Sequence, residues 1–100
     1  MDVKQFDLAA AQASDLIKAL AHPARLRIVC ALSGRECSVT DLAEIAGVPV
    51  SAISRHLALL RKDRIVKARR ARQTMHYSLS DARIGKFVAV LAETFCPAPP

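Results

Sequence analysis

The 100-residue sequence is poor in aromatic residues, and this scarcity determines what its core is made of. Trp is absent, and the aromatic side chains are Phe6, Tyr77, Phe87 and Phe95. Because 52 % of the residues are hydrophobic and 24 % are charged, the composition is typical of a globular chain rather than a disordered one. We expect a single domain over residues 1–100, with a core built mainly from Leu, Ile, Val and Ala.

The sequence also lacks long apolar stretches and a leader-like start. The longest uninterrupted apolar run, residues 87–92, is far shorter than the ~20 residues of a membrane helix. The first residues contain no basic stretch followed by an apolar one, so no secretory signal is predicted. Three cysteines are too few, and odd in number, for a disulfide framework. We therefore expect a cytoplasmic protein with no membrane partner, whose thiols are reduced by default.

Acidic residues are scarce in the second half, where positive charge accumulates. Residues 1–50 carry a net charge of −1, whereas residues 51–100 carry a net charge of +7. The basic residues concentrate between Arg55 and Arg72, where Asp63 is the one acidic residue. Such a stripe favours a polyanionic partner. A merely solvated basic face is the alternative that composition alone leaves open.

Apolar spacing and helix breakers predict two helices in the first third of the chain. Apolar residues recur at helical spacing over residues 4–21. His22 and Pro23 end this helix and begin the next, because Pro is well tolerated at a first helical position. The second helix is predicted to extend to about Leu32, with Gly34 as its stop.

The middle of the sequence predicts two further helices separated by a glycine. Ser38 followed by Asp41 is typical of a capped helix start, and Gly47 interrupts the short helix that follows. The next helix is predicted over residues 51–62. Its buried stripe is predicted to be Ile53, Leu57 and Leu60.

From residue 65 the pattern changes to an alternation of apolar and polar residues. Residues 65–69 and 75–79 alternate around a polar tip at residues 70–74, which predicts a two-stranded β-hairpin. Helical spacing returns over residues 81–95. The predicted fold is therefore mainly α with a small β-hairpin, in the order α-α-α-α-β-β-α of a winged helix-turn-helix.

The predicted elements have the organisation of a DNA-binding unit. A short helix, a turn at Gly47 and a second helix with a small, polar and basic outer face form a helix-turn-helix over about residues 38–62. A helix in the major groove must expose side chains that read base edges while its other face packs on the protein. The hairpin, over about residues 65–79, is typical of a wing that reaches an adjacent groove. The predicted DNA-binding residues are Ser51, Ser54, Arg55, His56, Arg61, Lys62, Arg70, Arg72 and Gln73.

The predicted roles of Ser51 and His56 differ from base reading alone. Ser51 can reach a phosphate from the first helical turn, and His56 either reads a base or contacts a phosphate, which the sequence leaves open. Ser54 and His56 lie two positions apart on one helix and point in different directions, so they are not a nucleophile–base pair. No enzyme is predicted.

Three stretches of the sequence resemble the ArsR/SmtB family of winged-helix repressors. They are LIKALAHPARLRI at residues 16–28, SVTDLA at residues 38–43 and SRHLALLR at residues 54–61. The resemblance implies a homodimeric repressor whose first and last helices, about residues 4–21 and 81–95, form the dimer interface. It also implies an operator in double-stranded DNA that is an imperfect palindrome, and an inducer that releases the DNA.

The sequence departs from the family at two positions. Pro49 stands where members usually have a helix-capping Ser, so we expect the following helix to begin a residue later or differently. Arg64 stands where many members have Gly. We expect Arg64 to adopt a backbone conformation that is unfavourable for a residue with a side chain.

The cysteines decide which inducer the resemblance implies. The arsenic-type site needs a C-V-C triplet where residues 38–40 read SVT, and the last-helix zinc site needs His residues that residues 81–95 lack. Cys30 and Cys96 instead match the dithiol members, which include BigR, SqrR and HlyU and sense persulfides or oxidants. The resemblance thus implies a thiol switch at Cys30 and Cys96, a reactive sulfur species or oxidant as inducer, and no metal or cofactor. Cys37 has no counterpart in that signature and is expected to be a bystander.

Two other interpretations stay open at this point. One is a metal- or metalloid-responsive repressor that uses a nonstandard cysteine site. The other is a DNA-binding module whose cysteines are incidental, since a Cys such as Cys30 on an apolar helix is by itself typical of an inert core thiol.

Overall fold

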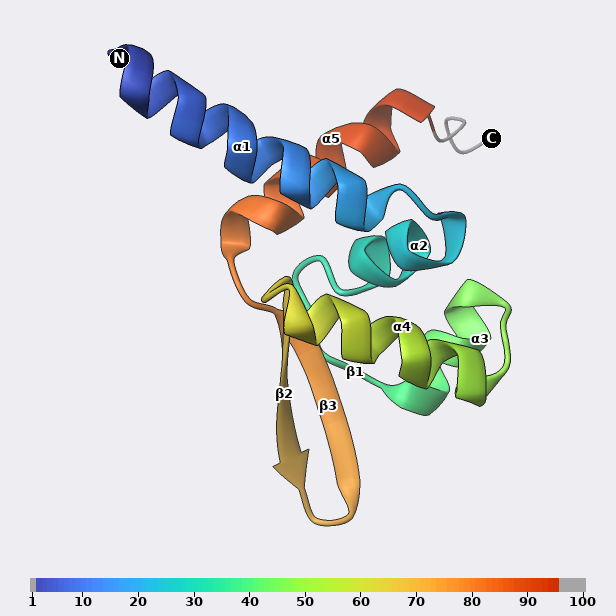
Figure 1. The fold of residues 1–100 in the computed structure, drawn as a ribbon. Coiled ribbons are helices and arrows are strands. Elements are labelled where there is room, and N and C mark those ends of the chain that lie inside the picture. The colour runs from blue at the N-terminus through green and yellow to red at the C-terminus, as the bar shows by residue number, and fades with distance from the viewer. Residues whose placement is uncertain (1, 96–100) are drawn as a thin grey trace.

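The computed structural model describes residues 2–95, which form five helices and a three-stranded sheet (Figure 1). In chain order the elements are α1 (Val3–Leu20), α2 (Pro23–Ala31), β1 (Cys37–Ser38), α3 (Val39–Ala46), α4 (Val50–Lys62), β2 (Val66–Ala71), β3 (Thr74–Leu79) and α5 (Ala82–Phe95). The hairpin of β2 and β3, hereafter the wing, projects at the opposite end from α1 and α5 (Figure 1). This arrangement confirms the predicted winged helix-turn-helix.

The turn between α3 and α4 follows the capping residues that the sequence offers. The Ser38 hydroxyl accepts a hydrogen bond from the backbone N–H of Asp41 at 3.1 Å, and the Asp41 carboxylate accepts one from the Ser38 N–H at 3.2 Å. Gly47 then ends α3 in the left-handed conformation, with φ of 67°. α4 begins at Val50, one residue earlier than predicted. The reason is that Pro49, with φ of −61°, already has the backbone of a residue that precedes a helix.

The wing has longer strands and a shorter tip than predicted. β2 and β3 pair antiparallel as far as Ala71 and Thr74, so the tip shrinks from residues 70–74 to Arg72 and Gln73. Arg70, which the prediction places in the tip, instead lies in β2. Backbone pairing continues through polar residues, whereas the apolar alternation in the sequence reports only which side chains are buried.

The sequence predicts two strands, and the structure adds a third. β1 pairs with β3, with Cys37 opposite Tyr77 and Ser38 opposite His76, and the strand order is β1-β3-β2. A strand of two residues is too short to show any alternation. This pairing ties the wing to the segment between α2 and α3.

The core is aliphatic, as the composition predicts. All three positions of the predicted stripe on α4 are buried, with relative exposures of 1 % or less. The largest fully buried side chains are Ile28, Val29, Leu32, Leu42, Ile53, Leu57, Leu60, Val66 and Val88. Removing each of these from water stabilises the fold by roughly 1.5–3 kcal/mol. The buried face of α4 therefore anchors this helix to α2 and α3 and leaves its other face to solvent.

In contrast, α1 and α5 leave large apolar side chains exposed. Phe6 and Ile17 on α1 are 62 % and 55 % exposed, and Val90 and Phe95 on α5 are 59 % and 79 % exposed. None of the helices within residues 2–95 combines the length and the hydropathy of a membrane span. The two helices thus present apolar surface that the single chain does not cover.

Candidate nucleic-acid interface

One face of α4 is exposed and polar. Ser51, Ser54 and Arg55 are exposed, on the side of the helix opposite the buried Ile53 and Leu57. The 3.6-residue period of the helix separates these two sets, so the core makes no use of the exposed face. Arg61 and Lys62 are also exposed, at the end of α4 from which the wing projects (Figure 1).

The first turn of α4 has no side-chain cap. Pro49 occupies the N-cap position but supplies no side-chain acceptor for the first N–H groups of the helix. The positive end of the helix dipole lies at this turn, where Ser51 exposes its hydroxyl. A phosphate oxygen is the kind of group that such a turn accommodates.

His56 is placed differently from the other predicted residues of α4. It is half-buried, and its ring centroid lies 4.7 Å from that of His22 at the start of α2. Among the described residues its Nδ1 atom is buried without a hydrogen-bond partner. Burial lowers the pKa of His56, and the nearby His22, Arg25 and Arg55 lower it further. The environment of His56 therefore favours the neutral ring.

The wing places its predicted residues at and near the tip. Arg70, Arg72 and Gln73 are all exposed, and Arg72 turns the chain with φ of 59°. Arg69 is held differently, because its Nε and Nη2 atoms each donate a hydrogen bond of 2.7 Å to the Glu36 carboxylate. The same contact lowers the pKa of Glu36. Sequence reasoning missed Glu36, since nothing local signals a contact with a residue 33 positions away.

Arg64 joins α4 to the wing in the strained conformation expected from the resemblance to a family in which many members have Gly there. Its φ is 60°, in the left-handed region where glycine is favoured. Its N–H donates to the carbonyl of Arg61 at 3.0 Å, which closes the last turn of the helix.

The cysteines occupy unlike environments. Cys30 lies on α2, half-buried against the core, and α2 packs against α5. Cys37 lies in β1 and is only 3 % exposed, and its Sγ donates a weak hydrogen bond to the Ala31 carbonyl at 3.9 Å. Burial raises the pKa of the Cys37 thiol, although Arg35 opposes this effect. Cys96 lies outside the described residues.

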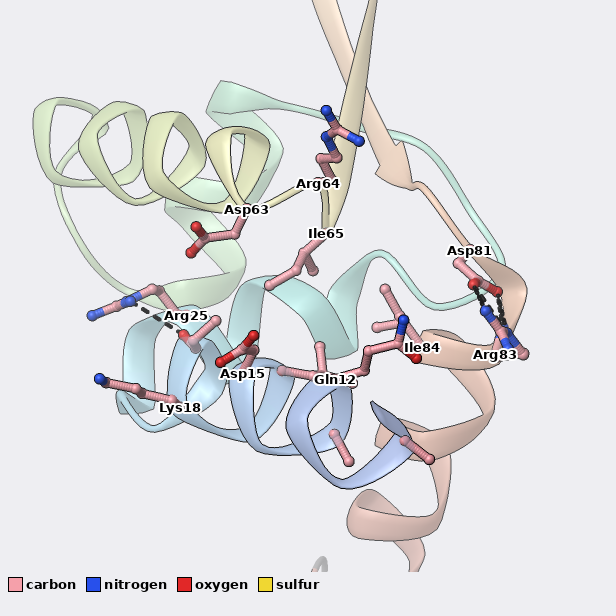
Figure 2. Close-up of a pocket in the computed structure, with 14 residues that line it drawn as sticks. Gln12, Asp15, Lys18, Arg25, Asp63, Arg64, Ile65, Asp81, Arg83 and Ile84 are labelled. Carbon is pink, nitrogen blue, oxygen red and sulfur yellow. Dashed lines mark hydrogen bonds and ion pairs between the residues drawn. The ribbon is translucent and has the colours of Figure 1, made fainter. Parts of the chain in front are cut away.

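A cavity of about 930 Å³ lies between α1, the end of α4 and the start of α5 (Figure 2). Its lining mixes the carboxylates of Asp15 and Asp63 with cations such as Lys18 and Arg25, so it does not select a ligand of one charge. Within residues 2–95, no group of three or more His, Cys, Asp or Glu is arranged to hold a metal ion. The exposed face of α4 and the basic wing define instead a winged helix-turn-helix DNA-binding protein.

Comparison with known proteins identifies the family. Residues 22–68 match the family described as "Bacterial regulatory protein, arsR family". Over 97 residues the chain is 36 % identical to the HTH-type transcriptional regulator YgaV of Escherichia coli K12, a match that covers 96 % of this chain and 98 % of YgaV. The chain therefore belongs to the ArsR family of DNA-binding transcriptional regulators and is not an enzyme.

Two solved structures extend the likeness to the whole fold. Reduced HlyU from Vibrio cholerae N16961 is 35 % identical, with a TM-score of 0.86 over 95 % of this chain and 100 % of that chain. The transcriptional repressor BigR from Xylella fastidiosa is 33 % identical, with a TM-score of 0.86 over 98 % of this chain and 100 % of that chain. These matches confirm the resemblance to the dithiol subgroup.

Proposed function

We propose that this chain is a dimeric, sequence-specific repressor in the cytoplasm, released from operator DNA by thiol chemistry at Cys30 and Cys96. The observation that carries the DNA-binding part is the joint exposure of a polar, basic face on α4 and a basic wing beside it. Ser54 and Arg55 read base edges in the major groove. The contacts that position the protein on the duplex come from Ser51, Arg61, Lys62, Arg70, Arg72 and Gln73.

The exposed apolar side chains of α1 and α5 support a dimer. Phe6, Ile17 and Val90 are each more than half exposed in the single chain. Exposed apolar patches of this kind mark protein interfaces. A two-fold dimer presents two copies of α4 to half-sites about one helical turn apart, so the operator is an imperfect palindrome.

The position of Cys30 supports the thiol switch. Cys30 lies on α2, which packs against α5, and Cys96 directly follows Phe95, the last residue of α5. A bond between the two sulfur atoms ties the end of α5 to α2. Because α5 belongs to the proposed dimer interface, the link changes how the two copies of α4 are oriented, and specific affinity falls.

The chemistry of the link is ordinary thiol oxidation. One thiolate is oxidised to a sulfenic acid by hydrogen peroxide, and the other displaces the oxygen as water. In total two thiols give up two electrons and two protons, and one peroxide is reduced to two molecules of water. A direct disulfide needs Cα atoms within ~7 Å. With an organic persulfide as inducer, two persulfide molecules and the two protein thiols give a trisulfide bridge, two small thiols and one hydrogen sulfide, and the additional sulfur tolerates a longer gap.

Intact-mass spectrometry of the reduced protein tests this function. Separate samples are treated with an organic persulfide, peroxide, an oxidised disulfide and Zn²⁺. We expect peroxide to remove two hydrogen atoms and persulfide to add sulfur, and peptide mapping to place both changes at Cys30 and Cys96. A stable zinc adduct with neither change would favour the metal-responsive interpretation instead.

A further inference from the structure

A cluster of His22, Arg25 and His56 joins α4 to the corner between α1 and α2. The rings of His22 and His56 lie 4.7 Å apart between their centroids, at an interplanar angle of 54°. Arg25 donates from Nη1 to the carbonyl of Ala19, near the end of α1, at 3.2 Å. The helix that reads DNA is therefore in contact with the segment that connects the first two helices.

The surroundings of both Nδ1 atoms accommodate an unprotonated nitrogen. The Nδ1 atom of His22 accepts a hydrogen bond from the N–H of Ala24 at 3.2 Å and so caps α2. A doubly protonated imidazole has no lone pair and cannot cap. The Nδ1 atom of His56 is buried, and among the described residues it has no hydrogen-bond partner that could accept a proton from it.

The charged groups that face His56 make protonation still less favourable. They are His22 and Arg25 at the start of α2, and Arg55 on α4 itself. A charged His56 would be a third cation beside Arg25 and Arg55, and its repulsion with Arg25 acts across the contact between α2 and α4.

We propose that His56 is a positioning residue, which fixes α4 against α2 through its contact with His22, and that acidification weakens operator binding by charging His56. The inference rests on the proposed function. When His56 becomes cationic, its buried Nδ1–H has no acceptor among the described residues and the ring repels Arg25 and Arg55. α4 then shifts, and it carries the adjacent Arg55 away from its place in the groove. His56 in this role does not itself contact DNA.

The direction of the pH effect separates this role from a direct contact. An imidazolium that touched a phosphate would strengthen binding as the pH falls. A His56 that positions α4 only when its ring is neutral weakens binding as the pH falls. The two roles predict opposite signs for one measurement.

The experiment measures operator affinity by fluorescence anisotropy at pH 7.5 and 5.5, at constant ionic strength. For the unmodified protein we expect affinity about tenfold lower at pH 5.5, within the usual range of coupling between sites. His56→Gln has no ring that can become charged, so its loss should be much smaller. The double variant His22→Asn, His56→Gln should show no loss. His76→Asn, in β3, is the matched control and should keep the full loss.

Two outcomes overturn the inference while leaving the proposed function intact. One is an unmodified protein whose affinity is unchanged or higher at pH 5.5, and the other is a His56→Gln protein that keeps the full tenfold loss. Failure to bind operator at either pH would overturn the proposed function itself. NMR titration of the imidazole signals gives a readout without DNA. There, His22→Asn should raise the pKa of His56, and an unchanged value would contradict the coupling between the rings.

Discussion

Arg69 in the wing and Glu36 before β1 form a two-pronged ion pair, with both hydrogen bonds at 2.7 Å. The side chains are 58 % and 37 % exposed, so the pair adds little to the stability of the fold. Its consequence is electrostatic. The charge of one wing arginine is neutralised by a carboxylate of the same chain, and we expect this pairing to withhold Arg69 from DNA.

Replacing Glu36 should release this arginine. In Glu36→Gln, Arg69 becomes available to a phosphate, so non-specific affinity should rise and the slope of log affinity against log salt should steepen by about one. A salt titration against random-sequence DNA measures the slope. Glu44→Gln, which removes an exposed carboxylate from α3, is the control and should leave the slope nearly unchanged. Equal slopes for Glu36→Gln and the unmodified protein would show that Arg69 is not withheld.

Arg55 and Arg72 should differ in what they recognise. Arg55→Ala should cost roughly 1–3 kcal/mol on the operator and much less on random DNA, because Arg55 is proposed to read a base. Arg72→Ala should weaken binding to both DNAs alike, because the wing contacts the backbone. Competition assays with the two DNAs compare the variants. If Arg55→Ala binds the operator as well as the unmodified protein does, α4 does not carry the recognition face.

The dimer should depend on the exposed apolar face of α5. Val90 is 59 % exposed in the single chain, so Val90→Asp should spare the core but bury an unpaired charge in the dimer. Sedimentation at micromolar concentration should show a monomer. Ile45→Asp, at a 46 % exposed position on α3, is the control and should remain dimeric. A monomer for the unmodified protein would remove the basis of the palindromic operator.

Arg64 should be a site of relievable backbone strain. Because its φ is 60°, Arg64→Gly should raise the free energy of unfolding by up to about 1 kcal/mol, less the entropy that glycine adds to the unfolded chain. Urea denaturation gives this number. Arg61→Gly removes the same charge from inside α4 and should lower stability by about 1 kcal/mol instead. A loss of stability in both variants would mean that Arg64 makes contacts worth more than its strain.

The sequence predicts those features that depend on local chemistry. The capping box at Ser38 and the end of α3 at Gly47 each follow from one or two residues and their neighbours. The strain at Arg64 is expected only from the resemblance to a family in which many members have Gly there. The features it does not predict depend on partners far along the chain. β1 exists only because β3 lies beside it, and the hydrogen bonds of Glu36 require Arg69 to be brought near.

The residues of the candidate site show the same difference between features with local causes and features that depend on distant partners. Exposure of Arg55 follows from helical period, because it lies opposite the buried stripe of α4. The placement of His56 does not, because its ring packs beside that of His22, which lies on another part of the chain. Local pattern identifies which residues have suitable chemistry, and packing decides which of them remain available to DNA.

Release of operator DNA by single-cysteine variants tests the central claim most directly. Cys30→Ser and Cys96→Ser should bind the operator with normal affinity but no longer release it after treatment with persulfide or peroxide. Cys37→Ser should still respond, because burial raises the pKa of Cys37 and keeps it from reacting. Normal release by Cys96→Ser, or loss of response in Cys37→Ser alone, would contradict the thiol switch.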